Sequence, residues 1–192
     1  MLSLLPVVPA SAEMVTYVSG SVGTASIGEV TLKSSTGESR YTMKSGVPYS
    51  GAFGVKMDKL RLEAAVQYVT FDYGVPVNVT GVSGYNTFVT YMVNGYYDVP
   101  LGSQLLMPYV SVGLGGANWN DVNYNTFFGY SDESRSAFVW QAGVGVSAEV
   151  SDLLMLDVGF RHMKPSSVRW SAGAVSSASV NSLEATFRFM FD

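Results

Sequence analysis

The stretch Leu183-Glu184-Ala185-Thr186-Phe187-Arg188-Phe189-Met190-Phe191 alternates between two kinds of side chain. At the two-residue period of a β-strand, its apolar face carries Leu183, Ala185, Phe187, Phe189 and Phe191. Its other face carries Glu184, Thr186, Arg188 and Met190. A soluble β-protein would turn the apolar face toward a core. A face this rich in phenylalanine is instead typical of a strand that meets lipid on one side and a barrel lumen on the other.

The composition of the chain favours the same interpretation. Its 192 residues suffice for one domain, and charged residues make up 14% of them, against about 25% in a typical soluble domain. The 20 Gly, 12 Tyr and 10 Phe residues suit β-strands better than helices. The sequence has no charge-free apolar run of the roughly 18 residues that a spanning helix needs, so we expect any membrane crossing to use strands.

Two function classes are disfavoured by charge and cysteine content. The net charge of -4 and the pI near 4.9 argue against a nucleic-acid partner, which would require a basic face. The chain has no Cys, so it contains neither a disulfide framework nor a thiolate metal site. We expect no cofactor.

Residues 1–12 have the character of a secretory signal peptide without its basic region. Their apolar run ends in Ala10-Ser11-Ala12, a small-residue cleavage pattern before Glu13. The alternative is a short apolar arm. We therefore divide the chain into a signal remnant, residues 1–12, and a transmembrane β-barrel domain, residues 13–192.

Alternating segments recur along the rest of the chain. Eight are predicted as strands, at residues 14–22, 48–57, 60–71, 87–98, 105–117, 137–150, 153–163 and 183–191. Long polar connections (23–46, 72–84, 118–135 and 164–179) alternate with short turns at 58–59, 100–103 and 151–152. This asymmetry is typical of outer-membrane barrels, with long extracellular loops and short periplasmic turns. The predicted fold is all-β, an eight-stranded antiparallel up-and-down transmembrane β-barrel.

The two faces of the predicted strands test this fold more sharply. The mid-strand charges share one face and form a predicted lumen charge network of Lys56, Arg61, Glu63, Glu149, Asp157, Arg161, Glu184 and Arg188. They comprise four charges of each sign, and small residues accompany them, which suits a narrow, filled lumen. A soluble eight-stranded barrel would reverse the faces and enclose a ligand cavity. An ordinary β-sandwich with one solvated face is the other alternative.

Several stretches resemble the OmpA-type family of small outer-membrane barrels. They are Tyr17-Val18-Ser19-Gly20, Gly51-Ala52-Phe53-Gly54 with residues 60–68, residues 93–98 with residues 108–115, and Phe187-Arg188-Phe189-Met190-Phe191. More narrowly, the chain resembles the surface-antigen barrels of intracellular alphaproteobacteria. The resemblance implies a bacterial outer-membrane location, contact with outer-membrane lipid, and a C-terminal signal for the barrel-assembly machinery formed by Phe187, Phe189 and Phe191. Asp192 departs from the family pattern, in which an aromatic residue ends the chain.

Catalytic patterns are weak. His162 is the single histidine, so any histidine-dependent reaction must use it. Lipid A deacylases of the outer membrane place a serine two residues from the histidine, and this position is Lys164. The acidic residues Asp121, Asp132 and Glu133 lack the spacing of a calcium loop. We predict a protein that is not an enzyme.

The favoured function is a monomeric surface protein whose extracellular loops contact a host or environmental partner, or serve the envelope structure. The candidate contact residues are the aromatic side chains among polar loop neighbours, Trp119, Tyr124, Phe127, Phe128, Tyr130 and Trp170. Packing of the loops on one another is the competing explanation for them. The alternative function is a narrow, porin-like channel for ions or small solutes, although side chains nearly fill an eight-stranded barrel.

Overall fold

The structure, a computed structural model, describes residues 14–28, 30–34, 37–41, 45–72, 82–100, 106–125, 129–169, 175–177 and 179–191. Within these residues, none of the elements is a helix that is both long and apolar enough to span a membrane. The predicted signal segment 1–12 lies outside the described residues.

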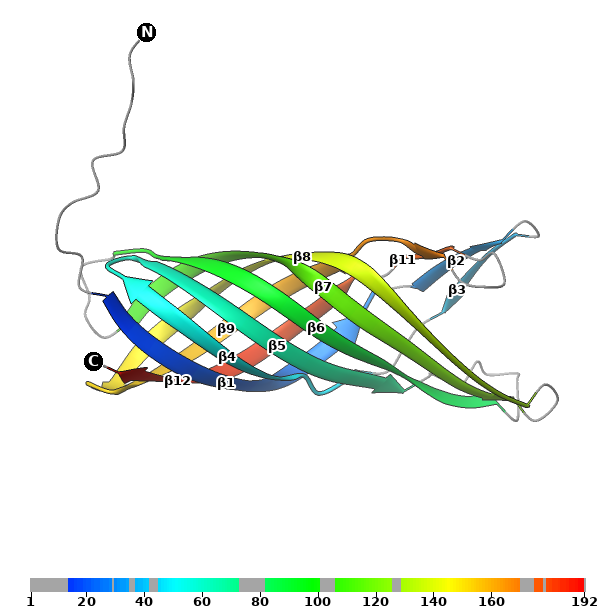
Figure 1. The fold of residues 1–192 in the computed structure, drawn as a ribbon, viewed down its shortest axis with the longest axis horizontal. Helices are drawn as coiled ribbons and strands as arrows, with labels where there is room; N and C mark the ends of the chain where they lie inside the picture. Colours follow the sequence, from blue (N-terminus) through cyan, green and yellow to red (C-terminus); the bar gives the residue numbers. More distant parts are fainter. Residues whose placement is uncertain are drawn as a thin grey trace, which may run out of the picture.

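Eight strands close into an antiparallel barrel (Figure 1). They are β1 (Met14–Ile27), β4 (Tyr49–Met57), β5 (Leu60–Asp72), β6 (Val82–Asp98), β7 (Leu106–Asn125), β8 (Gly129–Ser151), β9 (Leu154–Pro165) and β12 (Val180–Phe191). Each strand pairs with its neighbour in the chain order, and β12 pairs with β1, from Thr16↔Phe191 to Ile27↔Val180. The predicted eight-stranded up-and-down barrel is therefore confirmed, and the phenylalanine-rich strand closes it.

The two ends of the barrel differ. One end, here the turn end, carries the tight turns between β4 and β5 and between β8 and β9, together with the first residue of β1 and the last of β12 (Figure 1). Asp58 occupies the first of these turns with a φ of 53°, a left-handed conformation that aspartate tolerates better than most residues. The opposite end, here the loop end, carries the long connections.

At the loop end, the structure corrects the predicted loops. Residues 118–125 and 129–135 extend β7 and β8 as one hairpin, with pairing that continues to Asn125↔Gly129. A second sheet consists of β2 (Val30–Ser34), β3 (Gly37–Tyr41), β10 (Val168–Arg169) and β11 (Val175–Ser177). The prediction relied on polar composition, but backbone pairing above a membrane does not require an apolar face.

The direction of the side chains agrees with the predicted faces. Phe187 and Val144 point outward and are 48% and 55% exposed, whereas Glu63 and Arg188 point inward and are 7% and 1% exposed. A soluble barrel would show the opposite distribution. The outward band is apolar and the interior holds the ions, so the soluble ligand-carrying barrel and the β-sandwich are both excluded.

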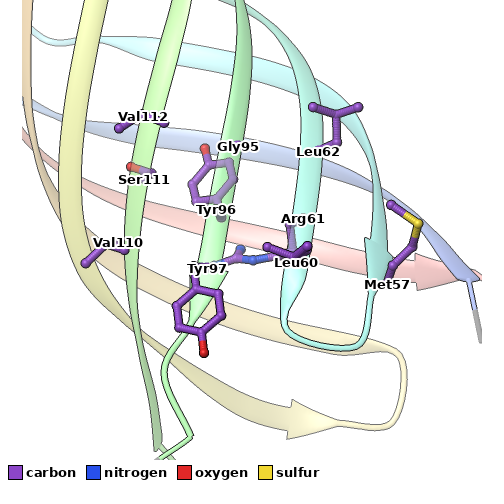
Figure 2. A pocket seen from close by; sticks show the side chains of 10 residues that line it. All are labelled: Met57, Leu60, Arg61, Leu62, Gly95, Tyr96, Tyr97, Val110, Ser111 and Val112. Atoms are coloured by element: carbon purple, nitrogen blue, oxygen red, sulfur yellow. The ribbon is translucent and has the colours of Figure 1, made fainter. Parts of the chain in front are cut away.

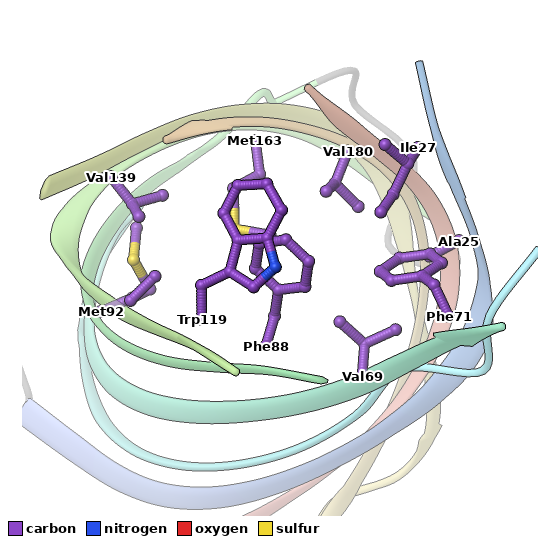
Figure 3. Close-up of a cluster of buried hydrophobic side chains, with 11 residues drawn as sticks. Ala25, Ile27, Val69, Phe71, Phe88, Met92, Trp119, Val139, Met163 and Val180 are labelled. Carbon is purple, nitrogen blue, oxygen red and sulfur yellow. The ribbon is translucent and has the colours of Figure 1, made fainter. Parts of the chain in front are cut away.

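The interior is divided into two layers. The turn-end layer is ionic, whereas the loop-end layer is an apolar plug, seen along the barrel in Figure 3. The apolar plug consists of Ala25, Ile27, Val69, Phe71, Phe88, Met92, Ala117, Trp119, Val139, Met163 and Val180. The sequence pattern predicts small residues and paired charges inside the barrel, whereas the structure places an apolar layer there as well.

Candidate functional site

At the turn end, an ionic cluster joins strands from opposite sides of the barrel. Arg61 Nη2 on β5 lies 2.8 Å from Asp98 Oδ1 on β6, and its Nη1 lies 3.4 Å from Asp157 Oδ2 on β9. Arg188 on β12 donates to both carboxylate oxygens of Asp157, at 2.9 and 3.2 Å. Lys56 Nζ approaches Asp98 Oδ2 at 3.5 Å. Asp157 therefore connects two arginines whose strands, β5 and β12, are not neighbours in the barrel.

Tyrosine rings lie against the guanidinium groups of this cluster. The Cζ atom of Arg61 lies 4.5 Å from the ring centre of Tyr96 and 4.8 Å from that of Tyr109. The Cζ atom of Arg188 lies 5.3 Å from the ring centre of Tyr17. The negative faces of these rings stabilise the two cations in a region with little water.

Glu63 forms the next level of the network. Its Oε1 accepts hydrogen bonds from the Tyr96 hydroxyl at 3.0 Å and from Asn94 Nδ2 at 3.2 Å, and its Oε2 accepts from the Tyr17 hydroxyl at 3.4 Å. Gln141 Nε2 donates to Asn94 Oδ1 at 2.6 Å and so extends the network to β8. These hydrogen bonds offset the cost of burying the Glu63 carboxylate away from water.

Glu184 forms the level above, toward the apolar plug. It accepts hydrogen bonds from Gln67 at 2.9 Å, Ser182 at 2.6 Å and Ser21 at 3.0 Å. Arg161 Nη1 lies 3.5 Å from Glu184 Oε2. The cavity beside this pair has a volume of about 10 Å³, the lower end of the roughly 10 to 15 Å³ that one water needs.

The network includes Asp98, which was not predicted as a member, and does not include Glu149, which was. Asp98 is 5% exposed and pairs with Arg61 and Lys56, whereas Glu149 has the inward register but lies exposed at the turn end. With Asp98 counted in place of Glu149, the interior still has four charges of each sign. The alternation Asn94, Tyr96, Asp98 on one face of β6 is the signal that could have identified Asp98.

Trp119 has a different location from the exposed one predicted for it. It is 4% exposed, its Nε1 donates to Asn86 Oδ1 at 2.7 Å, and its ring centre lies 4.6 Å from that of Phe88. Figure 3 shows its indole in the middle of the apolar plug. The prediction of a loop contact is therefore wrong for Trp119, because β7 continues past the expected end of the strand and turns this residue inward.

For the other predicted contact residues, the structure describes at most the backbone. Tyr124 and Tyr130 face each other across the β7–β8 hairpin as backbone partners. Phe127, Phe128 and Trp170 are outside the described residues. The predicted assembly signal lies on the outward face of β12, with Phe187, Phe189 and Phe191 exposed to 48, 49 and 47%.

His162 contacts one polar and one aromatic side chain on the neighbouring strands. Its Nδ1 lies 2.7 Å from Asn181 Oδ1, and its ring centre lies 5.8 Å from that of Trp140. Among the residues that the structure describes, no group of three His, Cys, Asp or Glu side chains could hold a metal ion. The interior thus offers a paired ionic network beneath a packed apolar layer, an arrangement that holds strands together.

Comparisons with known proteins agree with this architecture. The model of the family described as "Outer membrane protein beta-barrel domain" matches residues 1–191. Outer membrane protein PagN of Salmonella typhimurium is 35% identical over 102 residues. That match covers 50% of this chain and 41% of PagN, so the chain spans less than half of that relative.

Two solved structures share the fold. Neisserial surface protein A (NspA) superposes with a TM-score of 0.62 at 20% identity, covering 92% of this chain and 97% of NspA. The outer membrane protease OmpT of Escherichia coli superposes with a TM-score of 0.50 at 9% identity, covering 97% of this chain and 99% of OmpT. At these identities the likeness concerns the fold alone. The narrower resemblance to alphaproteobacterial surface antigens stays a prediction. The family match over almost the whole chain and the inside-out closed barrel together show that the protein belongs to the outer membrane protein beta-barrel domain family and is a small transmembrane β-barrel of the bacterial outer membrane.

Proposed function

We propose that the protein is a non-enzymatic surface protein that contacts a partner outside the cell through its loop end. The observation that carries the proposal is the projection of the β7–β8 hairpin beyond the barrel wall (Figure 1). β8 pairs with β9 only from Val139↔Pro165 onward, although it begins at Gly129. Ten residues of strand, roughly 30 Å at the rise of a β-strand, therefore extend past the end of β9.

The projecting hairpin is part of a three-stranded ribbon formed by β6, β7 and β8. Its β7 strand is held by β6 on one side, with pairing as far as Val82↔Asn125, and by β8 on the other. A three-stranded ribbon is stiffer than a loop of the same length, so contact residues on it lose less conformational entropy when they bind. Tyr124 and Tyr130 occupy the tip of this ribbon and remain the preferred contact candidates.

The packed interior supports a surface role over the alternative of a channel. An ion would have to pass both the apolar plug and the ionic cluster, in which Arg61 and Arg188 share Asp157. In a planar bilayer we expect the purified protein to give no stable ohmic current. A steady conductance would favour the channel function. The packed interior would then no longer be an argument for the surface role.

The decisive experiment shortens the hairpin. It removes the outer β6–β7 pairs, Val82↔Asn125 to Asn86↔Asp121, and keeps every β8–β9 pair. Asn120 and Ser134 are cross-strand partners, so residues 121–133 can be replaced by Asn-Gly, the two-residue turn that suits a β-hairpin. Under the proposal, bacteria that display the parent protein should adhere to cultured epithelial cells more than bacteria with an empty vector do, and the shortened protein should lose most of this gain. Heat-modifiable migration in SDS gels, which reports barrel folding, should be unchanged.

A second shortening serves as the control. Lys33 and Glu38 are partners in the β2–β3 hairpin, and replacing residues 34–37 by Asn-Gly trims a different projection of the same end. It should leave adherence near the parent level. If the β7–β8 variant folds and adheres as well as the parent does, the proposed contact surface is wrong. Assembly through Phe187, Phe189 and Phe191 and a monomeric state are part of the proposal and stay predictions.

A further inference from the structure

We propose that a groove on the outward surface near the turn end holds one acyl chain of a phospholipid from the periplasmic leaflet. The groove, here the acyl-chain groove, has a volume of about 440 Å³ and is lined by Leu60, Leu62, Gly95, Tyr97, Val110 and Val112, among others (Figure 2). Pockets that hold small molecules range from about 300 to 1,000 Å³, so it is large enough for a stretch of alkyl chain.

The groove exists because a glycine interrupts a row of large side chains. The strand register places Leu62, Gly95 and Val112 side by side across β5, β6 and β7. Leu62 and Val112 stand out from the surface, with 51% and 68% of their areas exposed. A Cβ atom at Gly95 would meet nothing within 4 Å, so the space between the two walls is open.

The next row toward the turn end closes the groove on that side. It consists of Leu60, Tyr97 and Val110, which are also cross-strand neighbours. In Figure 2 the hydroxyl of Tyr97 points toward the turn end, away from Gly95. Tyrosines at a membrane surface place the ring in the hydrocarbon and the hydroxyl among the headgroups. The groove therefore begins at headgroup depth, and Gly95 lies about 7 Å further along the strand, among acyl chains.

The location identifies the occupant. The groove is continuous with the apolar band that faces the membrane, and the turn end of an outer-membrane barrel lies on the periplasmic side. The medium at this depth is the phospholipid leaflet, and the exposed lining is apolar. Arg61 and Tyr96 also line the groove, but their polar groups bind Asp98 and Glu63 inside the barrel, and the Tyr97 hydroxyl points toward the headgroups (Figure 2). An acyl chain would therefore lie between Leu62 and Val112, with the lipid headgroup outside the groove.

Gly51 provides a matched control elsewhere on the same face. It also faces outward, and a Cβ atom there would likewise meet nothing within 4 Å. Its cross-strand neighbours are Gly20 and Val66, so it has a large side chain on only one side. A leucine at either glycine adds the same apolar volume to the outward surface, but only Gly95→Leu fills a groove.

The test uses a phosphatidylethanolamine that carries a diazirine halfway along one acyl chain. The full chain is reconstituted into phosphatidylethanolamine and phosphatidylglycerol vesicles with a few per cent of this probe, irradiated, and mapped by peptide mass spectrometry. Cross-links at Leu62 and Val112 should exceed those at the outward residue Val66 at least threefold. Gly95→Leu should abolish the excess, and Gly51→Leu should retain it. Heat-modifiable migration shows that each variant is folded.

Three outcomes would overturn the proposal. Equal cross-linking of Leu62, Val112 and Val66 in the wild-type protein would mean that lipid covers the band without a preferred site, and this comparison needs no variant. An excess that survives in Gly95→Leu would place the site elsewhere. A dimer in sedimentation experiments that Gly95→Leu dissociates would assign the groove to a second copy of the chain.

Discussion

Arg188 and Asp157 form a two-point ion pair inside the barrel, with Nη2 to Oδ1 at 2.9 Å and Nε to Oδ2 at 3.2 Å. The pair joins the closing strand β12 to β9, and Asp157 also reaches Arg61 on β5. Arg188 is 1% exposed, so its charge depends on these partners. The interaction ties the last strand of the chain to the far wall as well as to its neighbour.

Arg188→Met should lower the free energy of unfolding by about 3 kcal/mol, the lower end of the range for breaking a buried ion pair, because Asp157 retains Arg61. The measurement is urea unfolding in lipid vesicles. Glu149→Gln removes a charge that lies exposed at the turn end, and it should change stability by less than about 0.5 kcal/mol. Equal effects of the two substitutions would show that the ionic cluster does not stabilise the barrel.

Trp119→Ala should cost about 3 to 5 kcal/mol, because it empties the centre of the apolar plug and leaves Asn86 Oδ1 without the indole donor. Trp140→Ala is the comparison, since Trp140 points outward and is 41% exposed. It should cost less, as measured by the same unfolding experiment. A larger loss for Trp140→Ala would contradict the assignment of Trp119 to the core.

Val144→Arg should reduce insertion into vesicles and destabilise the barrel, because a charged side chain on the lipid face costs up to about 2 to 4 kcal/mol, its value at the bilayer midplane. Val144 is 55% exposed, and its partners Val110 and Phe160 point into lipid beside it. Val144→Leu keeps the position apolar and should insert as the parent does. The folded fraction in SDS gels without boiling measures both, and normal folding of Val144→Arg would count against a lipid-facing surface here.

Gly115→Ala should destabilise the protein by about 1 to 3 kcal/mol through overpacking. A Cβ atom at Gly115 would overlap the carbonyl oxygen of Tyr91 and crowd the side chain of Met92. Gly51→Ala has open space around it and should be neutral or slightly stabilising, since alanine loses less backbone entropy than glycine on folding. Midpoints of thermal unfolding in detergent distinguish the two, and a neutral Gly115→Ala would mean that β7 shifts to accommodate the methyl group.

Strand identity and the direction of most side chains could be predicted from the sequence, because the two-residue alternation is a local property. It was sufficient to place Phe187 outward and Arg188 inward, and to identify β12 as a strand that faces lipid. The extension of β7 and β8 could not be predicted in this way. The polar composition around Asn118, Asn120 and Asp121 is typical of a loop. These residues nevertheless pair with β8 through their backbone groups, and backbone pairing does not depend on side-chain composition.

The sequence by itself thus determined which face of each strand meets lipid, since side chains on a strand alternate regardless of what the strand packs against. Only the tertiary structure decided how high along the barrel each inward residue lies and what stands opposite it. Asp98 rather than Glu149 joins the arginines, Trp119 fills the interior, and Gly95 opens a groove between Leu62 and Val112. The reason is that these contacts depend on the tilt and register of strands far apart in the chain, which no local pattern contains.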